Sequence, residues 1–176
     1  TGTAWGLGLV WALGFYALAL SLAGWGFRSS YPHGRVGLCN VVTIARLALI
    51  SALVGALASD AVALAPMLSV AIAAFALDGV DGWLARRTHL ASDFGARFDV
   101  EVDSAFALIL ACLAVQAGLS PFVILLGLPR YLFGAAQWVV PALTGPLADR
   151  FSRKVVCVVQ IAALIVMTIP WLDPAL

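Results

Sequence analysis

Charged residues are scarce in this sequence. Asp, Glu, Lys and Arg make up 11% of its 176 residues, hydrophobic residues make up 63%, and the mean hydropathy is +1.04. A soluble domain carries about 25% charged residues, so this composition excludes a soluble globular domain. Apolar runs of about 20 residues, the length that crosses a bilayer, predict an all-α polytopic membrane protein. We expect six transmembrane helices, over residues 4–26, 40–58, 62–85, 95–117, 121–143 and 155–171.

Cysteine and histidine are scarce as well. The three Cys and two His are widely spaced, so neither a disulfide framework nor a zinc-ligand spacing is present. The net charge of +1 gives no reason to expect a nucleic-acid partner. No repeat, low-complexity tract or long linker is visible, which predicts a single membrane domain over residues 1–176.

The basic residues gather in alternate loops, between the first and second, third and fourth, and fifth and sixth spans. The loops near Asp60 and Ser120 contain none. Because Lys and Arg mark the cytoplasmic side of a membrane, this asymmetry predicts that both chain ends lie outside. We expect an integral protein of the bacterial inner membrane. Arg46 falls just inside the second span, and Arg130 is the one basic residue deep in a span.

Four aspartates form two stripes where the third span ends and the fourth begins. Asp78 and Asp81 share a helix face with Gly82, Ala85 and Arg86, at the spacing i, i+3, i+4, i+7 and i+8. A short turn follows, so the next helix is expected to run antiparallel beside this one. The first stripe therefore combines two carboxylates, small residues and a guanidinium.

On the fourth span, Gly95, Asp99 and Asp103 recur every four residues, after Ser92 or Asp93 as the helix cap. Four converging carboxylates repel each other unless a cation lies between them, and the spans offer too few basic side chains to pair with all. Oxygen ligands without His or Cys suit Mg²⁺, Mn²⁺ or Ca²⁺, and Mg²⁺ keeps positions that phosphate oxygens fill. The stripes predict a metal-dependent diphosphate site at the cytoplasmic end of the bundle.

These residues resemble the signature of a known family. The pattern Asp78-x-x-Asp81-Gly82-x-x-Ala85-Arg86, eight residues, then Gly95-x-x-x-Asp99-x-x-x-Asp103 looks like the full motif of the CDP-alcohol phosphotransferase (CDP-alcohol phosphatidyltransferase) family. "NVVTIAR", with Asn40, Thr43 and Arg46, is similar to the family's first core helix, with Cys39 in place of a proline. "RKVVCVVQ", residues 153–160, is similar to the start of a later helix. The resemblance covers about residues 38–165.

The resemblance implies transfer of a substituted phosphate group from a CDP-alcohol to an acceptor alcohol, with release of CMP, in phospholipid biosynthesis. CDP-diacylglycerol is the expected donor, and membrane lipids and a second copy of the chain are expected partners. The resemblance also implies two Mg²⁺ or Mn²⁺ ions. Asp78, Asp81 and Asp99 would hold one ion, and Asp78, Asp99 and Asp103 the other.

Further roles are implied by the same motif. Asp103 would take the proton of the acceptor hydroxyl. The residues that would contact the CDP-alcohol are Asn40, Thr43, Gly82, Ala85, Arg86, Ser92 and Gly95. Residues 1–37 would form an additional N-terminal transmembrane helix and loop before a core over residues 38–176.

The sequence departs from the family pattern in its number of core helices. The family core normally has six helices, counted from the Asn-Thr-Arg helix onward. This sequence has five predicted helices from that point. The sixth is expected either beyond Leu176 in a longer chain or in the span over residues 4–26.

Anion-binding residues for the acceptor are expected at Arg130, Arg153 and Lys154. If Arg130 binds an acceptor phosphate, the acceptor is a phosphorylated alcohol such as glycerol 3-phosphate or inositol phosphate. Family members that use glycerol phosphate usually carry an acidic residue after the equivalent arginine, whereas this chain has Tyr131. The acceptor therefore stays open between small and phosphorylated alcohols.

Two other functions account for aspartates in a membrane protein. An intramembrane prenyltransferase also uses aspartate clusters and Mg²⁺, but its clusters lie on distant helices, whereas Asp81 and Asp99 are close in sequence. A cation transporter would place its carboxylates near the midplane, on broken helices. Both functions rank below the transferase.

Overall fold

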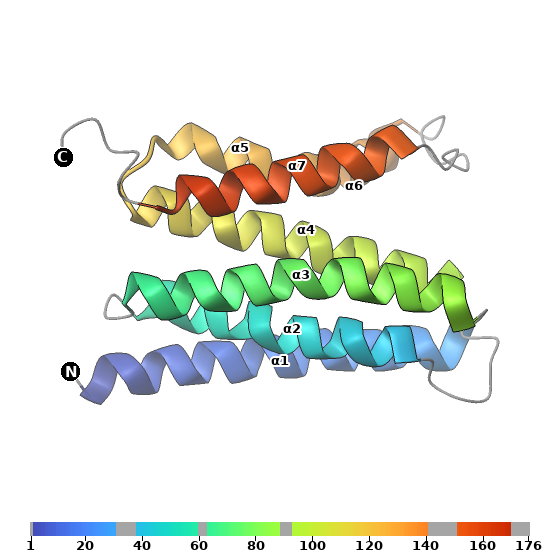
Figure 1. The fold of residues 1–176 in the computed structure, drawn as a ribbon, viewed down its shortest axis with the longest axis horizontal. Coiled ribbons are helices and arrows are strands. Elements are labelled where there is room, and N and C mark those ends of the chain that lie inside the picture. The colour runs from blue at the N-terminus through green and yellow to red at the C-terminus, as the bar shows by residue number, and fades with distance from the viewer. Residues whose placement is uncertain (1, 31–37, 60–62, 89–92, 141–150, 170–176) are drawn as a thin grey trace. The chain divides into compact units, whose positions relative to one another are not determined.

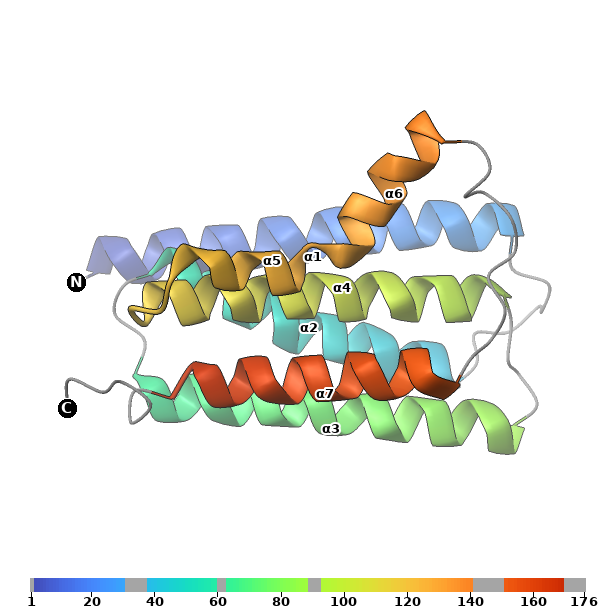
Figure 2. The same ribbon diagram turned by 90° about the horizontal axis from the view of Figure 1, so that it is seen from above.

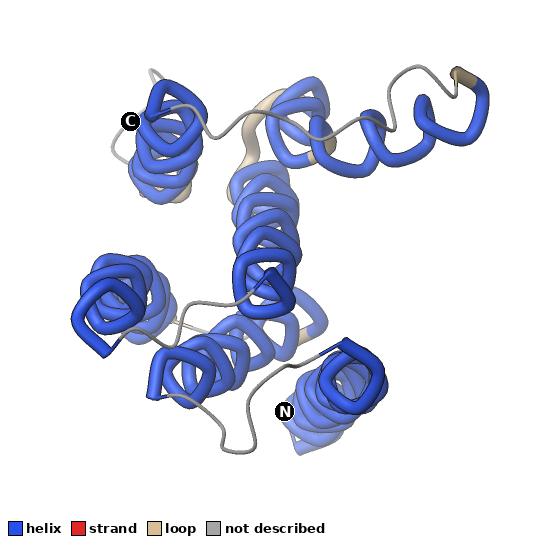
Figure 3. The backbone as a smooth tube through the Cα atoms, turned by 90° about the vertical axis from the view of Figure 1, so that its right-hand side faces the viewer, coloured by secondary structure: helices blue, strands red, loops and turns tan. Residues whose placement is uncertain are grey.

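The computed structural model describes residues 2–30, 38–59, 63–88, 93–140 and 151–169, without the side chains at 2–4, 28–30, 38–39, 81–88, 93 and 151–154. Within these ranges every regular element is helical and no strand occurs, which confirms the predicted all-α class (Figures 1 and 3). The elements are α1 (Gly2–Ser30), α2 (Leu38–Ala58), α3 (Leu64–Thr88), α4 (Asp93–Gln116), the 3₁₀ helix η1 (Pro121–Val123), α5 (Ile124–Gly127), α6 (Pro129–Val139) and α7 (Phe151–Met167).

The chain divides into two compact units, Thr1–Val102 and Asp103–Leu176. The boundary falls inside α4, which runs through it without a break. The position of Asp103 relative to Asp99 is therefore set by one turn of the same helix. The single membrane domain over residues 1–176 stays a prediction.

Among the residues that the structure describes, two helices are long and apolar enough to cross a membrane, over Trp5–Phe27 and Asn40–Ala58. The segments Pro121–Gly127 and Pro129–Val139 add a third if the bent pair is one span. Shorter apolar helices cover Leu64–Val80 and Val155–Met167. These helices make the chain an integral membrane protein, and the count of six spans stays a prediction.

The predicted fifth span, residues 121–143, is not one straight helix. It breaks between α5 and α6 with a bend of 66° (Figure 2). Pro129 begins α6, and proline has no N–H to continue the hydrogen bonds of the preceding helix. The last carbonyls of a helix need partners outside it, and Gln160 of α7 donates a hydrogen bond to the carbonyl of Leu126.

In the first unit, α2 lies at the centre, in contact with both α1 and α3 (Figure 1). In the apolar window of α2 44% of the residues are buried, against 6% in that of α1, so α1 is the outer helix. The two helices cross at Gly8 and Gly55. A Cβ at Gly8 would lie 2.7 Å from the carbonyl oxygen of Gly55, and one at Gly55 would lie 2.8 Å from that of Gly8. Only glycine allows the backbones to approach so closely.

The other end of α1 contacts the start of α4, also within the first unit. The rings of Phe27 and Phe94 meet edge to face, with centroids 5.8 Å apart and an interplanar angle of 84°. Phe94 stacks in turn on Phe98, one turn along α4, at 6.1 Å. Helix α1 therefore contacts the helix that carries Asp99 as well as α2.

In the second unit, α5 packs tightly against α4. A Cβ at Gly127 would lie 2.6 Å from the Cα of Leu108. The buried apolar residues of this unit include Phe106, Leu110 and Leu164. Close contact at Gly127 fixes α5 beside α4 immediately before the bend at Pro129.

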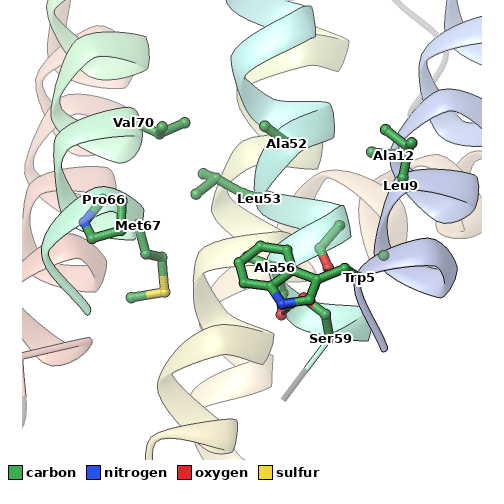
Figure 4. Close-up of a pocket in the computed structure, with 12 residues that line it drawn as sticks. Trp5, Leu9, Ala12, Ala52, Leu53, Ala56, Ser59, Pro66, Met67 and Val70 are labelled. Carbon is green, nitrogen blue, oxygen red and sulfur yellow. Dashed lines mark hydrogen bonds between the residues drawn. The ribbon is translucent and has the colours of Figure 1, made fainter. Parts of the chain in front are cut away.

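An apolar cavity of about 300 Å³ lies among α1, α2 and α3 (Figure 4). Among the described residues that line it, Ser59 alone carries a hydroxyl, which donates to the carbonyl of Gly55. Val70, the lining residue of α3 nearest to Asp78 in sequence, precedes it by eight residues, which is about 12 Å along a helix. The cavity is therefore separate from the aspartates. It is lined by Trp5, Gly8, Leu9, Ala12, Ala52, Leu53, Gly55, Ala56, Ser59, Pro66, Met67 and Val70.

Candidate functional site

A polar stripe begins the central helix α2. Asn40, Thr43 and Arg46 are spaced three residues apart and so lie near one face of the helix. All three are buried, with 5%, 4% and 0% of their surface exposed. Nδ2 of Asn40 has no hydrogen-bond partner among the described residues. A buried polar group normally has one, so this amide is a candidate to contact a ligand.

Arg46 connects α2 to two of the predicted aspartates. Its Nη1 atom donates to Asp78 Oδ1 of α3 at 3.0 Å and to Asp99 Oδ1 of α4 at 2.9 Å. The Arg46 side chain is fully buried, whereas those of Asp78 and Asp99 are 23% and 35% exposed. A buried guanidinium is stable only with hydrogen-bonded counter-charges, and these two carboxylates supply them.

Three of the four predicted carboxylates come together. Asp78, Asp99 and Asp103 each offer a carboxylate oxygen within 4.8 Å of the others, and all three side chains are half-buried. Asp103 follows Asp99 by one turn of α4, which places both on one face of that helix. Asp81 lies on α3, and its side chain is outside the described part.

The donors of this cluster fit a divalent cation. Carboxylate oxygens are hard ligands of the type that Mg²⁺, Mn²⁺ and Ca²⁺ prefer. Among the described side chains, the three carboxylates carry more negative charge than the guanidinium of Arg46 neutralises, and a bound cation would offset the excess. Half-burial leaves the carboxylates accessible to a cation and its ligands.

The structure describes the other predicted site residues only in part. Gly95 lies one turn before Asp99 on α4 and is half-buried. Arg130 is the second residue of α6 and is also half-buried. Gly82, Ala85 and Arg86 lie on α3, and Arg153 and Lys154 in the first turn of α7, with side chains outside the described part; Ser92 lies outside the described residues altogether.

One contact of Asp103 involves a residue for which the sequence suggested no role. Sγ of Cys157, on α7, lies 3.8 Å from Asp103 Oδ2, and the two residues are 54 positions apart. A thiol is a weak hydrogen-bond donor. No spacing in the sequence links this cysteine to the aspartate.

From the sequence, no basic partner is assigned to any of the aspartates, and the structure pairs Arg46 with two of them. Arg46 lies within the second predicted span, as expected, and its side chain is fully buried against Asp78 and Asp99. The available signal was its spacing from Asn40 and Thr43, which puts all three on one face of an otherwise apolar helix. A charge in such a stripe faces the bundle interior.

A family model for CDP-alcohol phosphatidyltransferases matches residues 36–176. The match includes the stripe of α2 and all four aspartates, and it begins after α1. Comparison with curated proteins and comparison with solved structures found no match. Members of the matched family use a CDP-alcohol donor and an alcohol acceptor and are typically dependent on a divalent metal. Because the match spans well over half of the sequence, the chain belongs to the CDP-alcohol phosphatidyltransferase family.

Proposed function

We propose that the protein transfers the phosphatidyl group of CDP-diacylglycerol to an alcohol and releases CMP, as a step of phospholipid biosynthesis. The observation that carries this proposal is the convergence of Asp78, Asp99 and Asp103 within 4.8 Å in a chain of this family. A diphosphate needs positive charge around it, and this cluster is suited to bind that charge as a metal ion.

The aspartates would hold two Mg²⁺ or Mn²⁺ ions. Asp78, Asp81 and Asp99 are assigned to one ion, and Asp78, Asp99 and Asp103 to the other. When bound, such ions stabilise the negative charge that develops on the leaving phosphate oxygen.

Asp103 is the proposed general base. The acceptor hydroxyl oxygen forms a bond to the phosphorus of the phosphatidyl group while the bond from that phosphorus to the CMP oxygen breaks. The hydroxyl proton passes to the Asp103 carboxylate. A positioned base contributes about 10²–10⁴-fold to a rate. Cys157 Sγ, 3.8 Å from Asp103 Oδ2, is placed to orient the carboxylate.

The CDP portion is assigned to the polar start of α2 and to the motif of α3 and α4. Nδ2 of Asn40, buried and without a hydrogen-bond partner among the described residues, can donate to a diphosphate oxygen. Arg86 can add a charge-assisted hydrogen bond. The remaining proposed contacts are Thr43, Gly82, Ala85, Ser92 and Gly95.

We place the site at the cytoplasmic end of a bundle of six spans in a bacterial inner membrane. Support comes from the basic residues, which gather in alternate loops. In this arrangement the donor's acyl chains stay in the bilayer while CMP leaves to the cytoplasm. A homodimer is part of the same proposal.

The acceptor is a small or phosphorylated alcohol. Arg130, half-buried near the start of α6, is the proposed anion-binding residue, together with Arg153 and Lys154. A guanidinium suits a phosphate because it donates two parallel hydrogen bonds.

The test is release of CMP by the purified protein with Mg²⁺ or Mn²⁺, CDP-diacylglycerol and a panel of acceptors. Release with at least one acceptor is expected, and Asp103→Asn should lower its rate by about 10²-fold or more. Glu101→Gln is the matched control, since Glu101 is exposed on the same helix and should leave the rate unchanged. Absence of CMP with every acceptor would refute the proposal. Consumption of a prenyl diphosphate instead would identify a prenyltransferase.

A further inference from the structure

One nitrogen of Arg46 contacts the carboxylates of both Asp78 and Asp99. Nη1 carries two hydrogens, and the two contacts, at 3.0 Å to Asp78 Oδ1 and 2.9 Å to Asp99 Oδ1, assign one hydrogen to each aspartate. The aspartates lie on different helices, α3 and α4, and Arg46 lies on a third, α2. The same buried atom therefore contacts carboxylates of two different helices, which constrains the distance between them.

We propose that Arg46 is the positioning residue of the metal site, an inference that rests on the metal-binding part of the proposed function. By holding one oxygen of Asp78 and one of Asp99, it fixes the orientation of both carboxylates toward a cation. Each carboxylate has two oxygens and about four lone-pair sites, so a contact at Oδ1 leaves acceptor capacity for a metal. Arg46 itself touches neither substrate nor metal in this role.

The positive charge of Arg46 and its positioning role predict opposite effects on metal affinity when Arg46 is replaced. Removing a positive charge beside a cation site should tighten cation binding, because like charges repel. Losing a group that orients metal ligands weakens metal binding, typically by about 10–100-fold. If Arg46 acts mainly by position, the second effect exceeds the first. The direction of the change in metal affinity therefore separates the two roles.

The experiment is Mn²⁺ binding to the purified protein in detergent, followed by electron paramagnetic resonance without any donor or acceptor. Arg46→Met should raise the Kd for Mn²⁺ by about 10-fold or more. An unchanged or lower Kd would overturn the proposal. The side chain of Met fills much of the volume of the arginine stem, so the loss of packing is small.

Arg46→Lys keeps the charge but not the fixed geometry of the guanidinium. It should bind Mn²⁺ more weakly than the parent and more tightly than Arg46→Met, and binding equal to the parent would again refute positioning. If Arg46→Met does not fold, as judged by size-exclusion chromatography, Arg46→Lys alone decides the question. Arg97→Met is the matched control, because Arg97 is exposed on α4 two residues before Asp99. Its Kd should stay within about twofold of the parent, since solvent and salt screen an exposed charge.

The outcomes for positioning and for the transferase can be told apart. If the parent releases no CMP but Arg46→Met still weakens Mn²⁺ binding, the transferase is wrong and the positioning role stands. If the parent releases CMP and the Kd does not rise, Arg46 does not position the site and the transferase stands.

Discussion

Arg46 donates a hydrogen bond to Asp99 across 2.9 Å, although 53 residues separate them in the sequence. The contact joins the helix with the buried stripe, α2, to the helix with two of the site aspartates, α4. Asp78 makes the equivalent contact from α3 at 3.0 Å. The three central helices of the site are therefore connected at one buried guanidinium, and this connection contributes both to stability and to the geometry of the site.

Replacing Asp78 by Asn should destabilise the protein even without metal. The substitution removes a charged partner of a fully buried arginine, and a hydrogen bond to a charged group contributes about 1.5–3 kcal/mol. Thermal unfolding in detergent with a chelator present measures this loss separately from any loss of metal. Glu101→Gln, an exposed carboxylate of α4, should shift the midpoint little. An Asp78→Asn variant as stable as the parent would show that the ion pair adds nothing.

Divalent metal should raise the stability of the parent. A ligand that binds only the folded state stabilises it by about 2.7 kcal/mol at a concentration of 100 times its Kd. Titration with Mg²⁺ or Mn²⁺ should therefore raise the unfolding temperature, and a chelator should reverse the rise and abolish CMP release. In Asp99→Asn the rise should be smaller or absent, because one of the three clustered carboxylates is lost. An equal rise in both proteins would place the metal elsewhere.

The positions of the long helices were predictable because apolar runs in a membrane have to form helices. The predicted spans over residues 4–26, 40–58 and 62–85 correspond to α1, α2 and α3. The bend at Pro129 was harder to predict from the sequence. A proline in an apolar run is compatible with a kinked span, and the 66° angle depends on tertiary contacts such as Gly127 against Leu108.

The site was partly predictable for a similar reason. Helical spacing alone places Asp99 and Asp103 on one face of α4, and a short turn places Asp78 nearby. Spacing does not show which cation neutralises the carboxylates. The side chain of Arg46 contacts Asp78 and Asp99 from a helix more than 30 residues earlier in the sequence. Such a contact depends on how α2 packs between its neighbours.

A larger residue at the crossing of α1 and α2 should separate the two helices. Gly8→Leu would place its Cβ 2.7 Å from the backbone oxygen of Gly55, and overpacking of this kind costs about 1–3 kcal/mol. The unfolding temperature in detergent should fall. Gly6→Leu is the control on the same helix, because nothing lies within 4 Å of a Cβ there, and it should match the parent. Equal stability of both variants would mean that α1 does not pack at Gly8.

The aromatic contact between α1 and α4 should appear as a coupling energy. Phe27 and Phe94 meet edge to face at 5.8 Å, and such pairs contribute about 0.5–1.5 kcal/mol beyond burial. A double-mutant cycle of Phe27→Ala and Phe94→Ala, read by denaturant or thermal unfolding, should give that coupling. Trp11, exposed on α1 and about 24 Å from Phe27 along the helix, provides the control cycle with Phe94. That cycle should be additive within about 0.5 kcal/mol; coupling of the same size in both cycles would contradict a direct contact.

The class of acceptor should be revealed by Arg130. If this half-buried arginine of α6 binds an acceptor phosphate, Arg130→Gln removes a charge-assisted hydrogen bond of about 1.5–3 kcal/mol. The KM for a phosphorylated acceptor should then rise by about 10–100-fold, while kcat/KM for an unphosphorylated acceptor changes little. Steady-state CMP release with matched acceptor pairs, such as glycerol 3-phosphate against glycerol, measures both. An equal loss of kcat/KM for the two acceptors would show that Arg130 acts on the donor or the fold instead. Only a contact with the acceptor phosphate would affect the phosphorylated acceptor more than the unphosphorylated one.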